Sequence, residues 1–556
     1  MISLISSPDL ALLAALALGL FALSARPGSR DSTAHLGQPI ETAIPMRDGK
    51  MLAADLYIPK RPGTYPTILI QTPYNRKQVG AALPNAGKAG PLVDPEEYAL
   101  VVVDWRGFHG SKSAGEGARF HPRGQDGYDT VEWIARQPWS NGKVGTWGPS
   151  ALGRIQFLTA KEQPPHLVCC VPVVASPGVT YADYYDNGVF REAHVKLLDR
   201  LGFGVLRMAY QAPSSAAPLY RVAAKALQPE RINVPMLLIS GWYDPGVASH
   251  LRAFEMLRAQ AGETTRQHTK MLVGPWHHTA IGQVRQGALE FPGATGESER
   301  AARLFLDYWL RGERQNGWDE LAAFRWWQMG EEGWHEATAP GALATTDWVL
   351  TLHADGRLDE RPAGAAEPSR AYIADPANPV PTRGGANVGY GTAGGMGIGP
   401  LDQSALESRP DVLVYTTPPM EKPRRLFGSA VLQFSFTIDR PDATFAVRLC
   451  NVHPDGRSLL ICDGATRARY RDGSGRPLQV VPGEVYTAVL TLPPTAITLP
   501  PGHRLRISIA GSNHPRFELN PHTGADHFDW ATAVSARCTL FHDAARPATI
   551  RVPLLP

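Results

Sequence analysis

The sequence predicts an α/β fold followed by a β jelly roll, and three observations support this prediction. Between about residues 38 and 320, short continuous apolar runs alternate with helical stretches, which is typical of a parallel sheet covered on both faces. Past about residue 340, many short alternating strands are separated by regular turns, as in a β-sandwich or jelly roll. The length of 556 residues exceeds what one core serves, so two or three domains are expected.

The parallel sheet is expected to use six apolar runs, each followed by a helix or a loop. The strands are predicted at 67–70, 100–104, 143–146, 167–174, 236–239 and 271–273. Helices are predicted at 129–136, 151–162, 247–259 and 298–311. The first of these carries Val131, Ile134 and Ala135 at helical spacing, which gives it one apolar face.

Residues 175–233 interrupt this alternation. No run typical of a strand occurs there, and tyrosines and charged residues recur at helical spacing, as at Tyr181, Tyr184 and Tyr185. A helical insertion between two sheet strands is the simplest interpretation. Such an insertion would lie above the sheet edge and could form a lid.

The C-terminal strands are predicted from alternating apolar residues. The expected buried faces are Leu432, Phe434, Phe436 and Ile438; Phe445, Val447 and Leu449; Val485, Thr487 and Val489; and Leu505, Ile507 and Ile509. The domain organisation that follows is an apolar N-terminal segment at 1–37, an α/β core at 38–174 and 234–335, a helical cap at 175–233 and a jelly roll at 336–556.

The N-terminal segment allows two interpretations. Residues 10–25 are apolar and uncharged, a length that suits the core of a signal peptide better than a spanning helix. However, Asp9 precedes this run and Arg26 and Arg30 follow it, which is the wrong charge order for an exported N-terminus. An exported or membrane-anchored protein and a cytoplasmic one are therefore both retained, and residues 10–25 are the one candidate for membrane association.

Composition excludes several classes of function. The net charge is only +3 and no block of Lys and Arg occurs, so no nucleic-acid partner is expected. Five cysteines are too few for a disulfide scaffold, and Cys169 and Cys170 lie in an apolar run, where buried inert thiols are expected. Cys450, Cys462 and Cys538 lack the spacing of a zinc site, so neither metal nor cofactor is predicted.

The stretch from Gly148 to Gly153 contains the candidate nucleophile, Ser150. A predicted strand ends there, a tight turn carries the serine, and a helix begins, which is the setting of a nucleophile elbow. Leu152 stands where the second glycine of the usual G-x-S-x-G pattern would be. Taken alone, this string favours a simple helix N-cap for Ser150.

An aspartate and a histidine downstream change this interpretation. Asp244 follows the strand predicted at 236–239, and the pair His277-His278 follows the strand predicted at 271–273. The carboxyl ends of parallel strands converge on one edge of the sheet, and the order Ser, Asp, His is that of α/β hydrolases. The predicted triad is therefore Ser150, Asp244 and one of the two histidines, in which the histidine takes the proton of Ser150 and the aspartate orients the ring.

These motifs together resemble the CocE/NonD hydrolase family, which includes cocaine esterase, α-amino-acid ester hydrolases and, more distantly, the X-Pro dipeptidyl-peptidases. The resemblance spans nearly the whole chain after about residue 38. It rests on the stretches at 44–49, 55–57, 72–74, 104–107, 111–115, 148–153, 241–244, 274–278, 375–381, 455–457 and 499–504. The G-x-S-x-x-G elbow is similar to the family's own form, so Leu152 is ordinary in this context.

The resemblance implies a fold, an activity and site residues. It implies an α/β-hydrolase domain with a helical cap, a C-terminal jelly roll of the galactose-binding-like type, and an acyl pocket where the three parts meet. It assigns the base to His278 and the oxyanion hole to the Tyr74 hydroxyl and the Ala151 backbone N–H. The aromatic residues near these motifs, taken as candidates for lining the pocket, are Trp147, Trp242, Trp276 and Tyr184.

The expected substrate is a small ester, cleaved through an acyl-enzyme. Relatives that act on α-amino acyl groups need acidic residues for the ammonium, yet Pro245, Gly246 and Val247 follow Asp244 here. This disfavours an amino-ester hydrolase and a dipeptidyl-peptidase, although acidic residues of the cap (Asp183, Asp186 and Glu192) could supply a cluster. Gly246 also replaces an aromatic residue of cocaine esterase, which argues against a cocaine-like aromatic acyl group.

The alternatives are an amidase or β-lactam-type acylase on the same scaffold, and a non-catalytic protein that binds carbohydrate through the jelly roll. The sequence leaves the acyl preference and the oligomeric state open, and a homo-oligomer is retained.

Overall fold

The computed structural model describes residues 38–82, 92, 94–117, 121–388 and 396–556. The predicted apolar segment at 10–25 lies outside these residues. Among the residues described, no helix is long and apolar enough to cross a membrane.

The α/β part is built on one sheet of ten strands in the order β1-β2-β4-β3-β5-β6-β9-β10-β13-β14. The strands are β1 (Ile40–Pro45), β2 (Met51–Tyr57), β3 (Tyr65–Thr72), β4 (Ala99–Asp104), β5 (Ser140–Pro149), β6 (Leu167–Val173), β9 (Leu237–Tyr243), β10 (Lys270–His277), β13 (Phe324–Gln328) and β14 (Gly333–Ala337). The strands from β4 through β13 pair in parallel, and β1, β2 and β14 add antiparallel edges. All six predicted strands are present, and the parallel α/β architecture is confirmed.

Helices cover both faces of this sheet. They are α2 (Arg76–Ala82), α3 (Arg123–Ala135), α4 (Ala151–Lys161), α9 (Val247–Gln260), α10 (Glu263–His268) and α11 (Glu297–Leu306), the last continued by a π-helix, Asp307–Arg311. Adjacent residues of β5 show the two layers, because Thr146 hydrogen-bonds Gln156 of α4 whereas Gly145 packs on Leu310 of the π-helix. The helix predicted at 298–311 therefore changes type in its last turn.

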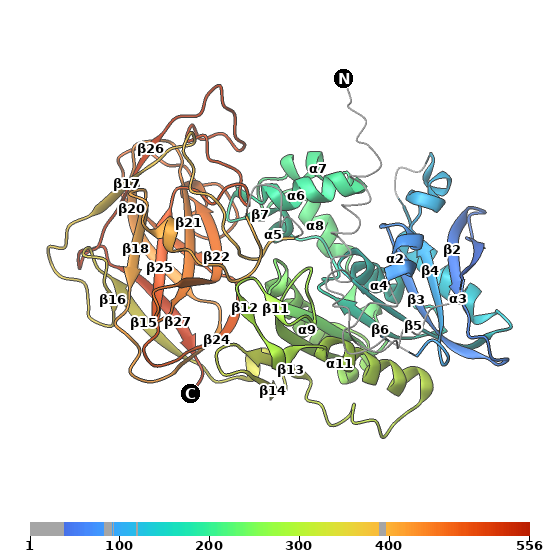
Figure 1. Ribbon diagram of the computed structural model, residues 1–556. Helices are drawn as coiled ribbons and strands as arrows, with labels where there is room; N and C mark the ends of the chain where they lie inside the picture. Colours follow the sequence, from blue (N-terminus) through green and yellow to red (C-terminus); the bar gives the residue numbers. More distant parts are fainter. Residues whose placement is uncertain (1–37, 83–91, 93, 118–120, 389–395) are drawn as a thin grey trace.

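The insertion between β6 and β9 forms the cap, which lies above the sheet in Figure 1. It contains α5 (Tyr181–Tyr184), α6 (Glu192–Leu198), α7 (Leu206–Tyr210) and α8 (Pro218–Lys225), with a small core of its own around Tyr185 and Phe190. A helical cap is confirmed, but it also holds a hairpin of two short strands, β7 (Tyr185–Asp186) and β8 (Val189–Phe190). Strands of two residues leave no period in the sequence, so the pattern did not indicate them.

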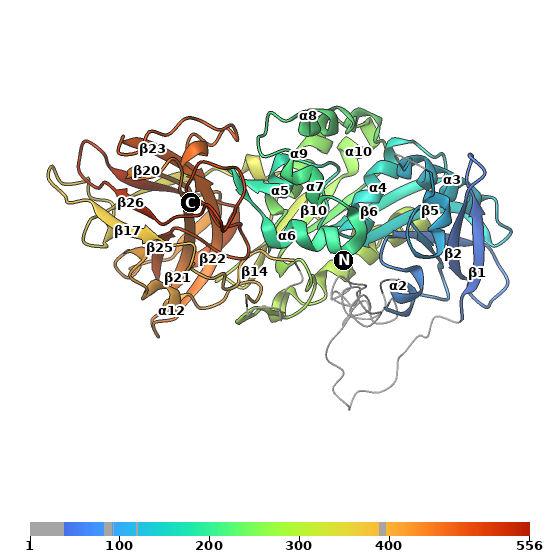
Figure 2. The same ribbon diagram turned by 90° about the horizontal axis from the view of Figure 1, so that it is seen from above.

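The C-terminal part consists of two facing antiparallel sheets, drawn in colours from yellow to red in Figure 1, and Figure 2 shows it beside the cap. The larger sheet contains β15 (Thr346–Leu352), β16 (Leu358–Asp359), β17 (Arg370–Ala374), β19 (Arg424–Gly428), β20 (Val431–Ile438), β23 (Tyr486–Thr491), β24 (Thr495–Leu499), β26 (Ala536–Leu540) and β27 (Ala548–Leu554). The smaller one contains β18 (Val412–Thr416), β21 (Thr444–Val452), β22 (Ser458–Arg467) and β25 (Arg504–Ala510). The predicted β-sandwich is confirmed.

Most predicted faces of this sandwich are buried, and one is not. The apolar residues predicted on β20, β21 and β25 are at most 2% exposed. In β23, however, the buried residues are Ala488 and Leu490, whereas Val485 is 46% exposed. The prediction for this strand was one residue out of register, and such a slip exchanges the two faces.

Candidate active site

Ser150 lies in a strained turn between β5 and α4. Its backbone has φ 57° and ψ −119°, a region that non-glycine residues rarely occupy and that costs about 1–3 kcal/mol. Its N–H donates to the Val173 carbonyl at 2.9 Å, and its own carbonyl accepts from Gly153 and Arg154 at the start of the helix. The serine therefore stands at the carboxyl end of a central strand and at the N-terminus of α4.

Two glycines make this turn sterically feasible. A Cβ on Gly148, which has φ 154°, would lie 2.4 Å from Cβ of Leu152. A Cβ on Gly153 would lie 2.6 Å from Cβ of Ala175 and 2.9 Å from the Gly148 carbonyl oxygen. The glycine that the sequence places at 153 rather than 152 thus lies where α4 passes close to the ends of β5 and β6.

Asp244 and His278 meet at the same edge of the sheet. Nδ1 of His278 lies 2.6 Å from Oδ2 of Asp244, and the Gly246 N–H donates to Oδ1 of Asp244 at 2.6 Å. Burial raises the pKa of the Asp244 carboxyl, but His278, His250 and the Gly246 N–H outweigh it, so the pKa lies below its ordinary value. The carboxylate is therefore ionised at neutral pH, and Nδ1 of His278 is engaged with it.

The neighbouring His277 has different surroundings. Its backbone N–H donates to Gln286, and its ring contacts Thr279. Burial lowers its pKa to about 4, so it is neutral at pH 7. Of the two adjacent histidines, His278 is the one held against Asp244.

Tyr74 lies one strand away from Ser150, just after β3. Burial raises the pKa of its phenol, and hydrogen bonding with the Ser150 side chain and the Ala151 backbone lowers it in part. The hydroxyl is therefore a neutral donor beside the serine. Ser150, Ala151, Tyr74, Asp244 and His278 all line one cavity of about 480 Å³.

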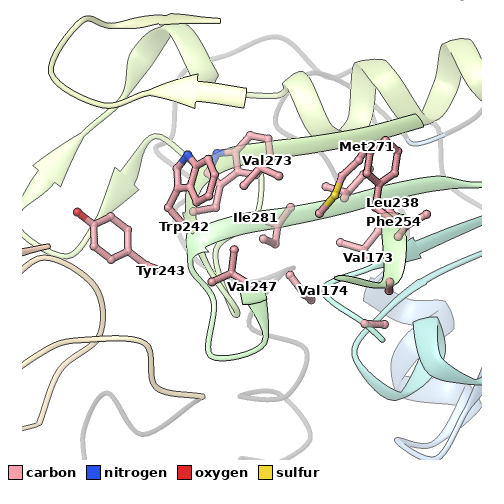
Figure 3. Packing of buried hydrophobic residues seen from close by; sticks show 14 of the residues in the cluster. Val173, Val174, Leu238, Trp242, Tyr243, Val247, Phe254, Met271, Val273 and Ile281 are labelled. Carbon is pink, nitrogen blue, oxygen red and sulfur yellow. The ribbon is translucent and has the colours of Figure 1, made fainter. Parts of the chain in front are cut away.

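The wall of this cavity comes from the sheet edge, from α4 and from the cap. Its apolar side chains include Ile155 and Leu158 from α4, and Leu197, Leu201, Phe203 and Met208 from the cap. The hydrophobic packing beside the Asp244 loop, with Val174, Val247 and Ile281 next to strand β9, is shown in Figure 3. The sequence did not single out these four apolar cap residues, because helical periodicity cannot tell which face covers a cavity.

Of the four aromatic residues proposed for the pocket, Tyr184 lines it and three tryptophans do not. Trp242 donates from its indole to the Trp327 carbonyl and packs on Phe427, and Trp276 is fully buried against Trp334. Trp147 is likewise buried, at 8% exposure. Successive side chains of a strand point to opposite faces of the sheet, so a tryptophan close in sequence to a site residue can face away from the site. The prediction for these three residues relied on sequence proximity alone.

The acidic residues weighed for an ammonium group are not gathered in the cavity. Asp183 lines it, but one of its oxygens caps α5 by accepting from the Thr180 N–H and hydroxyl. Asp186 accepts from the Ala465 N–H, and Glu192 pairs with Lys196. The cap thus provides one carboxylate to the cavity rather than a cluster.

Comparison with known proteins identifies both parts of the chain. Residues 48–217 and 207–280 match the model of the X-Pro dipeptidyl-peptidase (S15 family), and residues 316–551 match the model of the X-Pro dipeptidyl-peptidase C-terminal non-catalytic domain. The cocaine esterase of Rhodococcus sp. (strain MB1 Bresler) is 29% identical over 544 residues, covering 86% of this chain and 92% of that protein.

Solved structures support the same assignment at the level of the fold. An aminopeptidase from a marine sediment archaeon, Thaumarchaeota archaeon, has a TM-score of 0.82 at 22% identity and covers 96% of this chain and 99% of its own. An α-amino acid ester hydrolase has a TM-score of 0.80 at 21% identity, covering 95% and 98%. With both domains matched, the expected α/β-hydrolase fold is confirmed: the chain joins an X-Pro dipeptidyl-peptidase (S15 family) domain to that family's C-terminal non-catalytic domain, and it is a serine hydrolase of the kind expected from its resemblance to the CocE/NonD hydrolases.

Proposed function

We propose that the protein hydrolyses carboxylic esters through an acyl-enzyme, with Ser150 as nucleophile, His278 as base and Asp244 as the residue that orients the base. The observation that carries this proposal is the 2.6 Å contact between Asp244 and Nδ1 of His278, in the cavity that Ser150 also lines. Because Nδ1 is engaged, Nε2 is the ring nitrogen left to exchange a proton with the serine.

The reaction proceeds in two steps. Oγ of Ser150 bonds to the ester carbonyl carbon while its proton passes to Nε2 of His278, and the alcohol leaves with that proton. Water then adds to the acyl-enzyme, giving its proton to His278, and the acid is released as Ser150 regains a proton. The negative charge on the carbonyl oxygen in each step is stabilised by the Tyr74 hydroxyl and the Ala151 N–H, which adjoin the serine.

An ester of a non-amino acid is favoured over an α-amino acyl substrate. Asp183 is the one cap carboxylate that lines the cavity, and Arg154 lies 3.6 Å from it, so an ammonium group would meet a cation there. Ester and amide hydrolysis use the same triad, so matched esters and anilides separate the two activities.

Fluorophosphonate labelling tests the proposal, with the adduct mapped by peptide mass spectrometry. We expect the adduct on Ser150 and its loss in Ser150→Ala. In a panel of p-nitrophenyl esters, matched anilides and amino-acid esters, we expect turnover of the esters. Ser150→Ala should reduce the rate to a residual acceleration of about 10³–10⁴-fold over the reaction in water. A well-folded protein that takes up no label would instead favour the carbohydrate-binding alternative.

A further inference from the structure

The charged residues of the cavity are unequally distributed between the two signs. Among the described residues that line it, the cations are Arg123, Arg154, Lys161 and Arg191, and the carboxylates are Asp183 and Asp244. Asp244 is bound to His278, and the Lys161 ammonium donates to the Ala226 carbonyl. Three guanidinium groups therefore share one remaining carboxylate, in a cavity whose other walls are largely apolar.

Arg154 is the guanidinium nearest in sequence to the nucleophile. It lies one turn of α4 after Ser150, and its backbone N–H donates to the Ser150 carbonyl. Its nearest carboxylate oxygen is Oδ1 of Asp183 at 3.6 Å, which is longer than a hydrogen bond, and its side chain makes no hydrogen bond with any residue that the structure describes. Apart from this long ion pair, the N–H donors of Arg154 have no acceptor among the described residues, and the side chain is 34% exposed.

The other two arginines form no ion pair with a carboxylate within 4 Å in the described part of the chain. Arg191 donates to the carbonyls of Ala182 and Pro245, which are neutral acceptors. Arg123 lies over the ring of Trp105 at 4.8 Å, its buried Nε has no acceptor, and burial lowers its pKa. Among the described residues that line the cavity, the three guanidinium groups thus outnumber the carboxylates that are free to pair with them.

Such an arrangement favours an anionic ligand. An arginine fork matches the two oxygens of a carboxylate, and the long ion pair with Asp183 leaves the partly exposed Arg154 guanidinium accessible to a ligand. We propose that the natural ester carries a carboxylate, on its acyl or its alcohol part, which binds Arg154 while Ser150 attacks the ester carbonyl. This inference rests on the proposed esterase function and names its substrate class.

The test compares each charged ester with a neutral partner of the same size. On the acyl side, the pair is mono-p-nitrophenyl suberate and p-nitrophenyl octanoate. On the alcohol side, the pair is 4-acetoxybenzoate and 4-acetoxybenzamide. We expect the wild-type protein to prefer the charged ester in at least one pair, as measured by the ratio of the two kcat/KM values, and the pair that shows it identifies the part of the substrate that bears the acid.

The variant Arg154→Gln should lower this ratio by at least about tenfold, because it removes a charge-assisted hydrogen bond. The ratio for Arg154→Lys should lie between those of the wild type and Arg154→Gln, since lysine keeps the positive charge but cannot donate two parallel hydrogen bonds to a carboxylate. The matched control is Arg221→Gln, an exposed arginine of the cap helix α8 that does not line the cavity, which should leave the ratio unchanged. Uptake of the fluorophosphonate label shows that each variant is folded.

Two outcomes would overturn the inference. A wild-type protein that prefers the neutral ester in both pairs has no anion site, and a ratio that Arg154→Gln leaves unchanged shows that Arg154 does not provide one. In either case, labelling of Ser150 and turnover of neutral esters would leave the proposed function intact. A protein that takes up no label and cleaves neither member of either pair would refute the esterase function, and the inference with it.

Discussion

Gly153→Ala is the substitution that most directly tests how α4 positions the predicted nucleophile. The added methyl group would lie 2.6 Å from Cβ of Ala175, 2.9 Å from the Gly148 carbonyl oxygen and 3.1 Å from the Val173 carbonyl oxygen. Ordinary van der Waals contact begins near 3.4 Å, so the closest pair is about 0.8 Å too near. Two of the three obstructing atoms belong to backbone, which cannot rotate away as a side chain would.

The helix must therefore move relative to β5 and β6, and it carries both Ser150 and the Ala151 N–H with it. Overpacking of this kind destabilises a protein by about 1–3 kcal/mol. A displacement of Ser150 approaching 1 Å relative to His278 and Tyr74, which do not move with α4, costs on the order of 10²-fold in rate. We expect kcat/KM for p-nitrophenyl butyrate to fall by about that factor, with a lower midpoint of thermal unfolding.

Two further variants separate this effect from a general cost of alanine. Gly333→Ala is the control, because a Cβ there has no heavy atom nearer than 4.0 Å; it should behave as wild type. The double variant Gly153→Ala/Ala175→Gly removes the 2.6 Å contact but leaves both carbonyl contacts, so recovery should be partial. If Gly153→Ala retains wild-type turnover and stability, the close approach of α4 to the sheet does not determine the position of the Ser150 turn.

Three more predictions concern the residues around the serine. Tyr74→Phe should lower kcat by about 10²-fold or more and change KM less, which pre-steady-state and steady-state assays of one ester can measure. A much smaller loss of kcat would contradict the assignment of Tyr74 to the oxyanion hole. Asp244→Asn should lower kcat by on the order of 10⁴-fold while Ser150 still labels slowly, because the amide no longer holds the His278 ring in its working tautomer; near wild-type turnover would contradict the triad. Burial lowers the pKa of His250 from 6.5 to about 4, so between these pH values the unfolded state binds a proton that the folded state does not. The free energy of unfolding should therefore fall as the pH drops from 6.5 to 4, by up to about 3 kcal/mol. In urea unfolding, the difference in this free energy between pH 7 and pH 5 should be smaller for His250→Gln than for the wild type, and equal differences would exclude His250 as the source.

The parts predicted best from the sequence are those that depend on the period of a continuous strand. The runs at β5, β9 and β10 placed Ser150, Asp244 and His278 at carboxyl ends of neighbouring or nearby strands, and the structure has them lining one cavity. The failures have equally local causes. In β23 the apolar and polar residues alternate weakly, so the buried residues Ala488 and Leu490 were less conspicuous than the exposed Val485.

Specificity is harder to predict than chemistry for a reason that the fold makes explicit. The residues proposed for catalysis follow strand ends, whose mutual positions are determined by sheet register and are therefore visible in the order of the strands. Most of the cavity wall instead comes from the cap, whose helices are short and whose faces depend on packing with each other and with the jelly roll. Arg154 is the exception, since it lies four residues after Ser150 on a helix whose start the elbow determines. Arg154 lies one turn after Ser150 on the same side of α4 and lines the cavity, so under the anion-site proposal this position carries information about the charge of the substrate that the cap sequence does not.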